Sequence, residues 1–235
     1  MLELEGLTTR YGSITAIRDV ELHVGAGEVV GLIGPNGAGK TTTLATVAGL
    51  LQPAAGRVRF DGVDVTGWSP DRMLRAGLAL VPEHRRIFTD LTVAENLQVA
   101  GVTVSAADRR RLLEEVAERF PVLKDKWTTR AGFLSGGEAQ QLAIARALMS
   151  EPRMICMDEP SLGLAPTLVD AVFELIAELR RQGRTLLVVE QNARRMLEVA
   201  DRAYVMRTGE VAASGPAAEL ARREDLFETF VGGGS

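Results

Sequence analysis

The chain has 235 residues, 46% of them hydrophobic, and a formal net charge of −4 at pH 7, which fits one large α/β domain, or one domain with an insert, around a substantial core. The acidic balance argues against a broad nucleic-acid-binding surface, and no segment reaches the roughly 18 unbroken apolar residues of a membrane-spanning helix. Residues 1–5 are acidic where a signal peptide is basic, and the single cysteine, Cys156, cannot form an internal disulfide, so we expect a cytoplasmic protein.

Residues 1–30 alternate apolar and polar side chains in short steps, which predicts strands of an antiparallel sheet. Tyr11 lies in a turn-like break between two of these strands. An exposed aromatic ring ahead of a phosphate-binding loop could stack on a purine, although an ordinary surface tyrosine is an equally good interpretation.

The stretch GPNGAGKT at residues 34–41 fits the G-x-x-x-x-G-K-[ST] pattern of a P-loop. It follows a predicted buried strand at residues 28–33 and precedes a predicted helix at residues 40–48. The glycines allow backbone N–H groups to surround phosphate oxygens, and the helix N-terminus adds the positive end of its dipole. We expect Lys40 to reach the β- and γ-phosphates of a nucleotide and the Thr41 hydroxyl to hold Mg²⁺. The alternative, a glycine-rich turn with a solvated lysine, does not account for the flanking strand and helix.

The middle of the chain predicts a helical insert in an otherwise α/β domain. A buried strand at residues 78–81 leads into a polar, arginine-bearing loop at residues 83–91. A capping box begins another helix at residue 92, and residues 105–120 predict a further one. No strand pattern follows this helix as far as the LSGGE sequence, so we place the insert at about residues 68–133.

The sequence LSGGE at residues 134–138 runs into a predicted helix at residues 139–149. A capping box between Ser135 and Glu138 explains the serine and the glutamate. It does not explain two consecutive glycines, each of which costs about 1 kcal/mol of helix stability relative to alanine. Paired glycines at a helix N-terminus make a second phosphate-accepting surface. Because one chain cannot easily wrap two such surfaces around one nucleotide, we expect the second to serve the nucleotide of a partner.

Residues 154–159, MICMDE, predict an apolar strand that ends in two carboxylates. Asp158, at the carboxyl end of a strand beside a P-loop, can hold the hydration shell of Mg²⁺. Glu159, one residue further on, points elsewhere and can polarise a water for attack on the γ-phosphate. Two solvated acids at a strand end would be the better interpretation without the P-loop, and it is a poor one with it.

The remainder predicts further α/β units. Pro166 begins a helix that runs to residue 181, and residues 185–189 form the next buried strand. If right-handed crossovers build the sheet, this strand is parallel to the Asp158 strand, and Gln191 lies near the γ-phosphate. After it we expect a helix at residues 193–199, strands at residues 203–206 and 210–213, two short helices, and a flexible tail at residues 232–235.

The P-loop, the LSGGE sequence and the strand ending in Asp158 and Glu159, in this order, resemble the ATPase subunit of an ABC transporter over essentially the whole chain. A closer resemblance is to the ATP-binding subunit of branched-chain amino acid importers. It rests on VPE at residues 81–83, SLGLAP at 161–166 and VEQNA at 189–193. The resemblance implies one ABC ATPase domain over residues 1–235. Its fold would be that of an α/β P-loop NTPase, with a mostly parallel core sheet, an N-terminal antiparallel β subdomain and the helical insert.

The resemblance also implies a role for each matching residue, with ATP and Mg²⁺ as the bound groups. The residues implied to bind ATP are Tyr11, which would stack on adenine, and Gly34, Pro35, Asn36, Gly37, Ala38, Gly39, Lys40, Thr41 and Thr42. Those implied to hold Mg²⁺ are Thr41, Glu83 and Asp158. The catalytic ones are Glu159, as general base, Lys40 and Gln191. Ser135, Gly136 and Gly137 would contact the γ-phosphate of ATP bound to the opposing subunit.

Three positions depart from the pattern common in the family. Glu83 stands where most members carry glutamine, so it keeps an oxygen for the metal and adds a charge. Gln191 replaces a histidine, and it can donate a hydrogen bond but cannot carry a proton's charge. Gly163 and Leu164 replace a pattern that usually includes an aspartate. These changes bear on how the γ-phosphate is sensed.

We therefore expect an ATPase subunit that dimerises head to tail around ATP, with a copy of itself or a related ATPase, on the cytoplasmic face of the membrane. Its other partners would be membrane permease subunits and, through them, an extracytoplasmic binding protein, with no nucleic acid. The loop at residues 83–91 is predicted to dock a permease helix through Ile87, Phe88 and Leu91. The alternatives are a urea or amide importer, a soluble ABC ATPase acting on DNA or ribosomes, and a nucleotide-binding scaffold, which the presence of Glu159 argues against.

Overall fold

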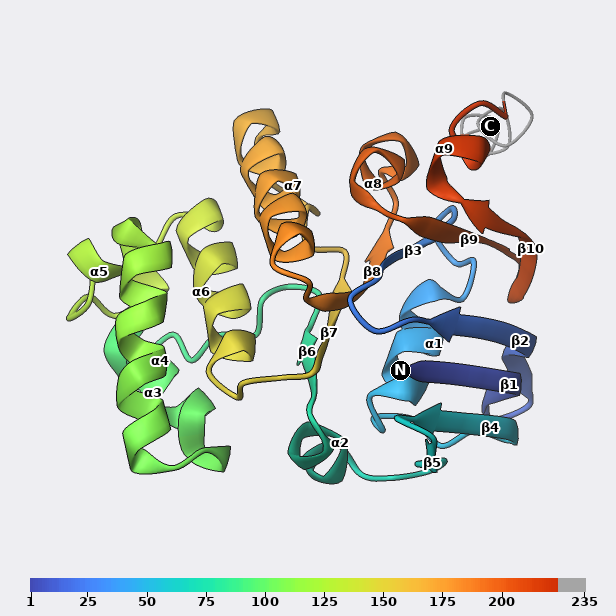
Figure 1. The fold of residues 1–235 in the computed structure, drawn as a ribbon, viewed down its shortest axis with the longest axis horizontal. Coiled ribbons are helices and arrows are strands. Elements are labelled where there is room, and N and C mark those ends of the chain that lie inside the picture. The colour runs from blue at the N-terminus through green and yellow to red at the C-terminus, as the bar shows by residue number, and fades with distance from the viewer. Residues whose placement is uncertain (224–235) are drawn as a thin grey trace.

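Two β-sheets organise the chain, which the computed structural model describes over residues 1–223 (Figure 1). The larger sheet has the strand order β10-β9-β3-β8-β7-β6, with β10 antiparallel to β9 and all other neighbours parallel. The smaller sheet is antiparallel, in the order β2-β1-β4-β5. The strands are β1 (Leu2–Tyr11), β2 (Ile14–Val24), β3 (Val29–Ile33), β4 (Ala55–Phe60), β5 (Val63–Asp64), β6 (Leu78–Val81), β7 (Met154–Asp158), β8 (Thr185–Glu190), β9 (Arg202–Arg207) and β10 (Glu210–Pro216). The mostly parallel core sheet and the antiparallel N-terminal sheet expected from the sequence are confirmed.

Helices lie in the connections between most consecutive strands of the larger sheet. They are α1 (Lys40–Val47), α2 (Pro70–Ala76), α3 (Val93–Ala100), α4 (Ala106–Arg119), α5 (Pro121–Asp125), α6 (Gly136–Leu148), α7 (Pro166–Arg181), α8 (Ala193–Val199) and α9 (Ala217–Leu220), with 3₁₀ turns at Gly101–Thr103 and Ala131–Phe133. The predicted bounds of β6, α7 and α8 agree with the structure. Helix α6 begins earlier than predicted, at Gly136, because the capping box places Ser135 at the N-cap. The second short C-terminal helix and the tail at residues 232–235 lie outside the described residues.

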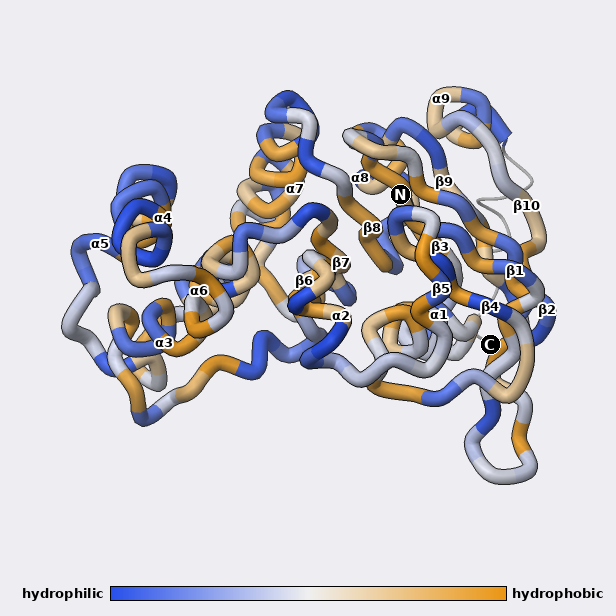
Figure 2. Tube along the Cα trace, turned by 60° about the horizontal axis from the view of Figure 1, so that its bottom comes forward, coloured by the Kyte–Doolittle hydropathy of each residue, from blue (hydrophilic) through white to orange (hydrophobic). Residues whose placement is uncertain are grey.

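Strand β3, which carries the P-loop at its end, is covered on both faces. Val30 and Leu32 pack with Leu44 of α1 and with the smaller sheet, whereas Val29 and Ile33 belong to a second core with α6, α7 and α8. A parallel strand covered on both faces reads as a continuous apolar run, and all five residues of β3 are buried. In Figure 2, β8, another buried strand of this sheet, is mostly hydrophobic, whereas the more exposed helix α4 is mostly hydrophilic.

Helices α3, α4, α5 and α6 stand together at one end of the molecule (Figure 1, left). The range 68–133 expected for the helical insert needs a correction at its start. Strand β6 lies inside this range but pairs with β7 in the larger sheet, and Met73 of α2 packs into the core beneath the smaller sheet. The helical insert therefore begins after β6.

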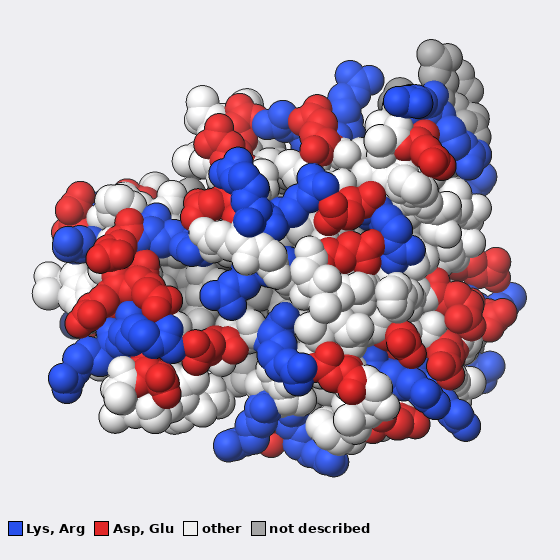
Figure 3. All heavy atoms as spheres, in the orientation of Figure 1, with Lys and Arg blue, Asp and Glu red and all other residues white. Residues whose placement is uncertain are grey.

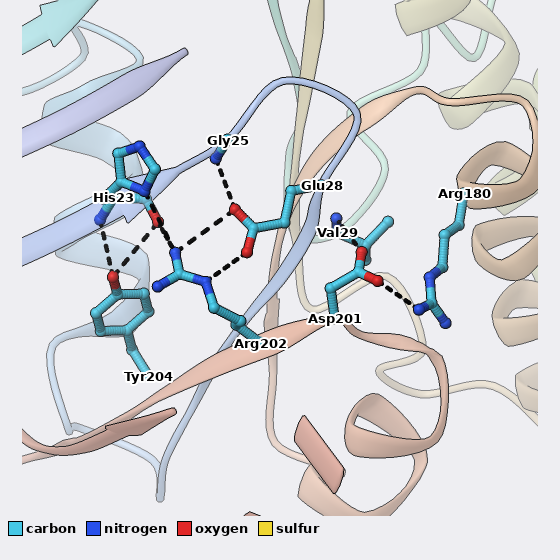
Figure 4. A network of polar contacts seen from close by, with 8 residues as sticks. All are labelled: His23, Gly25, Glu28, Val29, Arg180, Asp201, Arg202 and Tyr204. Carbon is cyan, nitrogen blue, oxygen red and sulfur yellow. Dashed lines mark hydrogen bonds and ion pairs between the residues drawn. The ribbon is translucent and has the colours of Figure 1, made fainter. Parts of the chain in front are cut away.

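A network of polar contacts ties the start of β3 to β9 and α7 (Figure 4). The Asp201 carboxylate accepts a hydrogen bond from the Val29 N–H at 2.9 Å and pairs with Arg180. Arg202 pairs with Glu28 from the turn before β3. These contacts hold the start of β3 in place, at the end of the strand opposite the P-loop.

The surface and the helix lengths give two further findings. On the face drawn in Figure 3, basic and acidic side chains are interspersed and form no continuous basic stripe. Within residues 1–223, none of the helices has the length and apolar character needed to cross a bilayer.

Candidate functional site

A cavity of about 560 Å³ opens at the carboxyl ends of the central parallel strands, where the P-loop follows β3. Its lining comes from several parts of the chain. They include residues 14–16 of β2, residues 36–42 of the P-loop and α1, Glu83, Glu159, Leu162 and Thr208. Ligands in open α/β sheets bind at this edge. The structure therefore brings the P-loop together with Glu83 and Glu159, as the sequence predicted.

Close approaches of neighbouring backbone and side chains explain two of the P-loop glycines. Gly39, the N-cap of α1, has φ of 101°, and a Cβ there would lie 2.6 Å from Cγ2 of Ile17. A Cβ on Gly34 would lie 2.5 Å from the carbonyl oxygen of Met206. Only glycine fits both positions, so the loop packs tightly against β2 and β9 before α1 begins.

Lys40 is buried, with 3% of its surface exposed. Its ammonium donates to the carbonyl oxygens of Gly34 and Pro35 at 3.0 and 3.2 Å, and its Nζ lies 3.2 Å from Oε1 of Glu159. A buried charge needs such partners. A phosphate oxygen that binds this ammonium would compete with the Glu159 carboxylate.

Thr41 and Asp158 meet between α1 and β7. The Thr41 hydroxyl donates to Oδ1 of Asp158 at 3.0 Å. Burial raises the pKa of Asp158 from 3.8 to about 6, with Glu83 and Glu159 adding negative charge, while the Thr41 hydrogen bond and Lys40 act in the opposite direction. The hydroxyl and the carboxylate are hard oxygen donors, the type that Mg²⁺ prefers, and a divalent cation would relieve the charge that raises this pKa.

Glu159 follows β7 in a left-handed backbone conformation, with φ of 45°. Its N–H donates to the carbonyl oxygen of Val189 in β8 at 2.9 Å. Left-handed geometry in a residue other than glycine is uncommon, and here it turns the Glu159 side chain toward Lys40 while Asp158 stays in line with the strand. The two neighbouring carboxylates therefore point to different places, as the sequence suggested.

Five residues predicted for this chain's own site are not among those that line the cavity, namely Tyr11, Gly34, Pro35, Asp158 and Gln191. Of these, Gly34, Pro35 and Asp158 contact its lining residues directly. Tyr11, the last residue of β1, is 52% exposed. Gln191 is exposed directly after β8, which does run parallel to β7 as predicted. Their roles stay predictions.

The LSGGE residues lie at the start of α6, apart from the P-loop cavity. Ser135 caps the helix by accepting from the Glu138 N–H at 3.4 Å, and the Glu138 carboxylate accepts from the Ser135 N–H at 2.8 Å. Ser135 and Gly136 are exposed, whereas Gly137 is buried. None of the three is among the residues that line the cavity holding this chain's own P-loop.

One buried carboxylate was missed from the sequence. Glu190 ends β8 with 1% of its surface exposed, and burial raises its pKa. It accepts hydrogen bonds from the N–H groups of Ser161, Gln191 and Asn192 at 3.0, 3.1 and 3.3 Å. Glu190 therefore joins the loop after Glu159 to the segment that carries Gln191. An acidic residue directly after the apolar run TLLVV was the available signal.

Comparison with known proteins gives consistent results. Residues 17–162 match the ABC transporter family. The chain is 45% identical, over 99% of its length and all of the relative, to the high-affinity branched-chain amino acid transport ATP-binding protein BraG of Pseudomonas aeruginosa. It is 34% identical to the lipopolysaccharide export system ATP-binding protein LptB of Haemophilus influenzae, with 99% and 97% of the two chains covered.

Solved structures agree in fold. An ATP-binding cassette of an ABC transporter in its ADP conformation superposes with a TM-score of 0.85 at 30% identity, covering 99% of this chain and 98% of that one. A dimeric cassette in a post-hydrolysis state with ADP and phosphate gives a TM-score of 0.82 at 26% identity, covering 92% and 99%.

Proposed function

Because the chain belongs to the ABC transporter family, as one of its ATP-hydrolysing subunits, we propose that it drives an importer for branched-chain amino acids. The proposed class of solute rests on the 45% identity to BraG, which extends over 99% of this chain and all of the relative. The subunit would lie on the cytoplasmic face of the membrane, bound to permease subunits and supplied by an extracytoplasmic binding protein.

The P-loop binds the triphosphate of ATP in this proposal. Backbone N–H groups of residues 34–42 and the N-terminus of α1 surround the phosphates. Lys40 exchanges its contact with Glu159 for the β- and γ-phosphates, which is supported by the 3.2 Å distance between the two side chains. Tyr11 stacks on the adenine.

Thr41, Asp158 and Glu83 would hold Mg²⁺, directly or through its water shell. Mg²⁺ supplies charge neutralisation at the β- and γ-phosphate oxygens when bound. The chain's part is to fix the donors. Thr41 and Asp158 already contact each other, and Glu83 is close enough to raise the pKa of Asp158.

Glu159 acts as the general base. Once a phosphate engages Lys40, the Glu159 carboxylate is released to accept a proton from the water that attacks the γ-phosphate. Gln191 donates a neutral hydrogen bond to the same phosphate. Positioning and charge neutralisation supply most of the catalysis of phosphoryl transfer.

A second subunit completes the site. Ser135 and Gly136, exposed at the start of α6, contact the γ-phosphate of ATP held by the opposing P-loop, with Gly137 behind them. That subunit is a copy of this chain or a related ATPase. Head-to-tail pairing is supported by the separation of α6 from the chain's own P-loop cavity.

The test is uptake of labelled leucine by vesicles containing the co-expressed permease subunits, with the Glu159→Gln variant as the matched control. We expect ATP-dependent uptake and hydrolysis by the wild type. The variant should bind ATP but lose about 10²–10⁴-fold in turnover. Uptake of urea or amides in place of leucine would refute the solute class alone. Wild-type hydrolysis by Glu159→Gln would refute the general base.

A further inference from the structure

The two glycines at the start of α6 have different surroundings. A Cβ on exposed Gly136 would meet only ordinary contacts, at 3.6 Å from an Arg85 nitrogen and 3.7 Å from Cδ2 of Leu164. A Cβ on buried Gly137 would lie 2.6 and 2.8 Å from the two Cδ atoms of Leu168 and 3.1 Å from its Cγ. Leu168 therefore rests directly on the bare backbone of Gly137, and a methyl group there would displace it.

Leu168 lies in the first turn of α7, which the chain reaches by a short loop from Glu159. The loop is bonded to itself and to the sheet. The Leu162 N–H donates to the Glu159 carbonyl at 3.1 Å, and the Ser161 N–H donates to the buried Glu190 carboxylate at 3.0 Å. These bonds connect Glu159 to the start of α7 through a short hydrogen-bonded loop.

Beyond this contact, a cavity of about 640 Å³ lies between α6 and α7. Gly137, Gln141 and Ile144 line it from α6, and Leu168 and Leu175 are among the residues that line it from α7. Packing between the two helices is therefore open along the next turns. The contact between Leu168 and Gly137 stands at the end of this cavity where α6 begins.

We propose that Leu168 is a positioning residue, which seats the first turn of α6 and so sets Ser135 and Gly136 relative to Glu159 of the same chain. The inference rests on the proposed function, in which α6 meets ATP bound to the opposing subunit. It separates the roles of the paired glycines. Gly136 is left open to the phosphate, and Gly137 is glycine because Leu168 occupies the space of its side chain.

The first experiment compares Leu168→Ala with Leu175→Ala, a leucine of the same helix and cavity that is not among the atoms against Gly137. Leu168→Ala should lower kcat and ATP-dependent dimer formation about tenfold, since a coupling of 0.5–2 kcal/mol corresponds to roughly 2- to 30-fold. Binding of a fluorescent ATP analogue should stay within about twofold. Leu168→Met, which conserves volume, should keep wild-type kinetics. Equal losses of kcat in the two alanine variants would overturn the inference.

The second experiment is a double-mutant cycle. Gly137→Ala should be defective because its methyl group displaces Leu168. In the Leu168→Ala background the same change should cost little, because the obstructing side chain is gone. A Gly137→Ala defect of the same size in both backgrounds would show that Gly137 acts independently of Leu168, and would overturn the inference.

Two measurements keep this inference distinct from the proposed function. Dimer formation is measured in the Glu159→Gln background, and failure of that parent to dimerise with ATP would refute self-pairing in the proposed function. Amide hydrogen exchange at residues 136–140 of the single chain still decides the inference. Leu168→Ala should accelerate it and Leu175→Ala should not, and equal exchange rates in the two variants would refute the positioning role.

Discussion

Replacing Asp158 with asparagine should stabilise the protein while removing its activity. Asp158 is 7% exposed, and its pKa is raised from 3.8 to about 6, chiefly by burial. At 1.36 kcal/mol per unit, the ionised carboxylate destabilises the folded state by up to about 3 kcal/mol. Asparagine keeps the shape and can still accept the hydrogen bond from the Thr41 hydroxyl. It removes the charge, so the free energy of unfolding should rise by about 1–3 kcal/mol at pH 8.

The pH dependence follows from the direction of the shift. A carboxyl group with a raised pKa in the fold destabilises it above that pKa, and the loss of stability disappears as pH falls from 6 toward 3.8. The advantage of Asp158→Asn should therefore be full at pH 8 and about half as large at pH 5. Urea denaturation of both proteins at several pH values, in buffer with a chelator, measures it. Asp125→Asn, at an exposed position in α5, is the control and should show neither effect.

Adding Mg²⁺ and ATP should cancel or reverse the advantage of Asp158→Asn in stability. A ligand at 100 times its Kd stabilises the folded state by about 2.7 kcal/mol. The wild type should gain this amount and Asp158→Asn much less, because the asparagine lacks the charge that a hard cation prefers. If, without Mg²⁺ and ATP, Asp158→Asn is less stable than the wild type at pH 8, or if the difference does not change with pH, the reasoning is wrong.

Three further predictions concern single side chains. Gln191→Ala should lower kcat more than ATP affinity, because the contact strengthens in the transition state, and Gln191→His should add an ionisation near ~6.5 to the pH profile; wild-type kinetics for Gln191→Ala would remove Gln191 from the site. Phe88 is 46% exposed in the loop after β6. Its change to aspartate should uncouple transport from ATPase activity, whereas Val63→Asp on the smaller sheet should not. Intact transport in Phe88→Asp would exclude the loop at residues 83–91 as the docking surface for the permease. Arg202→Ala should lower the free energy of unfolding by roughly 1–3 kcal/mol, less than for a fully buried pair because the Arg202 side chain is 33% exposed. Urea denaturation should show almost no change for Arg18→Ala, because the Arg18 side chain is 67% exposed in its pair with Glu210.

The parts of the site that the sequence predicted are those with a local signature. The P-loop, Asp158 and Glu159 each follow an apolar strand within a few residues, so composition and spacing place them at one edge of a parallel sheet. Helices with clear caps, such as α3 at Thr92, were predicted for the same reason.

The parts that were missed depend on contacts distant in sequence. Glu190 received no role from the sequence, because its partner Ser161 lies 29 residues away. The close contact of Leu168 with Gly137 could not be predicted from the LSGGE sequence, because Leu168 belongs to a different helix. The start of the helical insert was misplaced because β6 is a single short strand whose pairing with β7 is not local.

The charges of the site make a final prediction about ATP affinity. Among the described residues that line the P-loop cavity, Lys40 is the cation and Glu83 and Glu159 are carboxylates, with Asp158 directly beside them. A triphosphate brought to this set meets one ammonium and three acidic groups, so the side chains alone do not favour it. The backbone N–H groups and the N-terminus of α1 offset part of the repulsion, by about 0.3–1 kcal/mol for the helix dipole. A divalent cation between the phosphates and the carboxylates is needed to offset the remaining repulsion.

ATP affinity measured by calorimetry should therefore fall at least tenfold when a chelator replaces Mg²⁺, and Glu83→Gln should reduce that fall by removing one negative charge. A Kd that is independent of Mg²⁺ would show that the carboxylates do not face the phosphates.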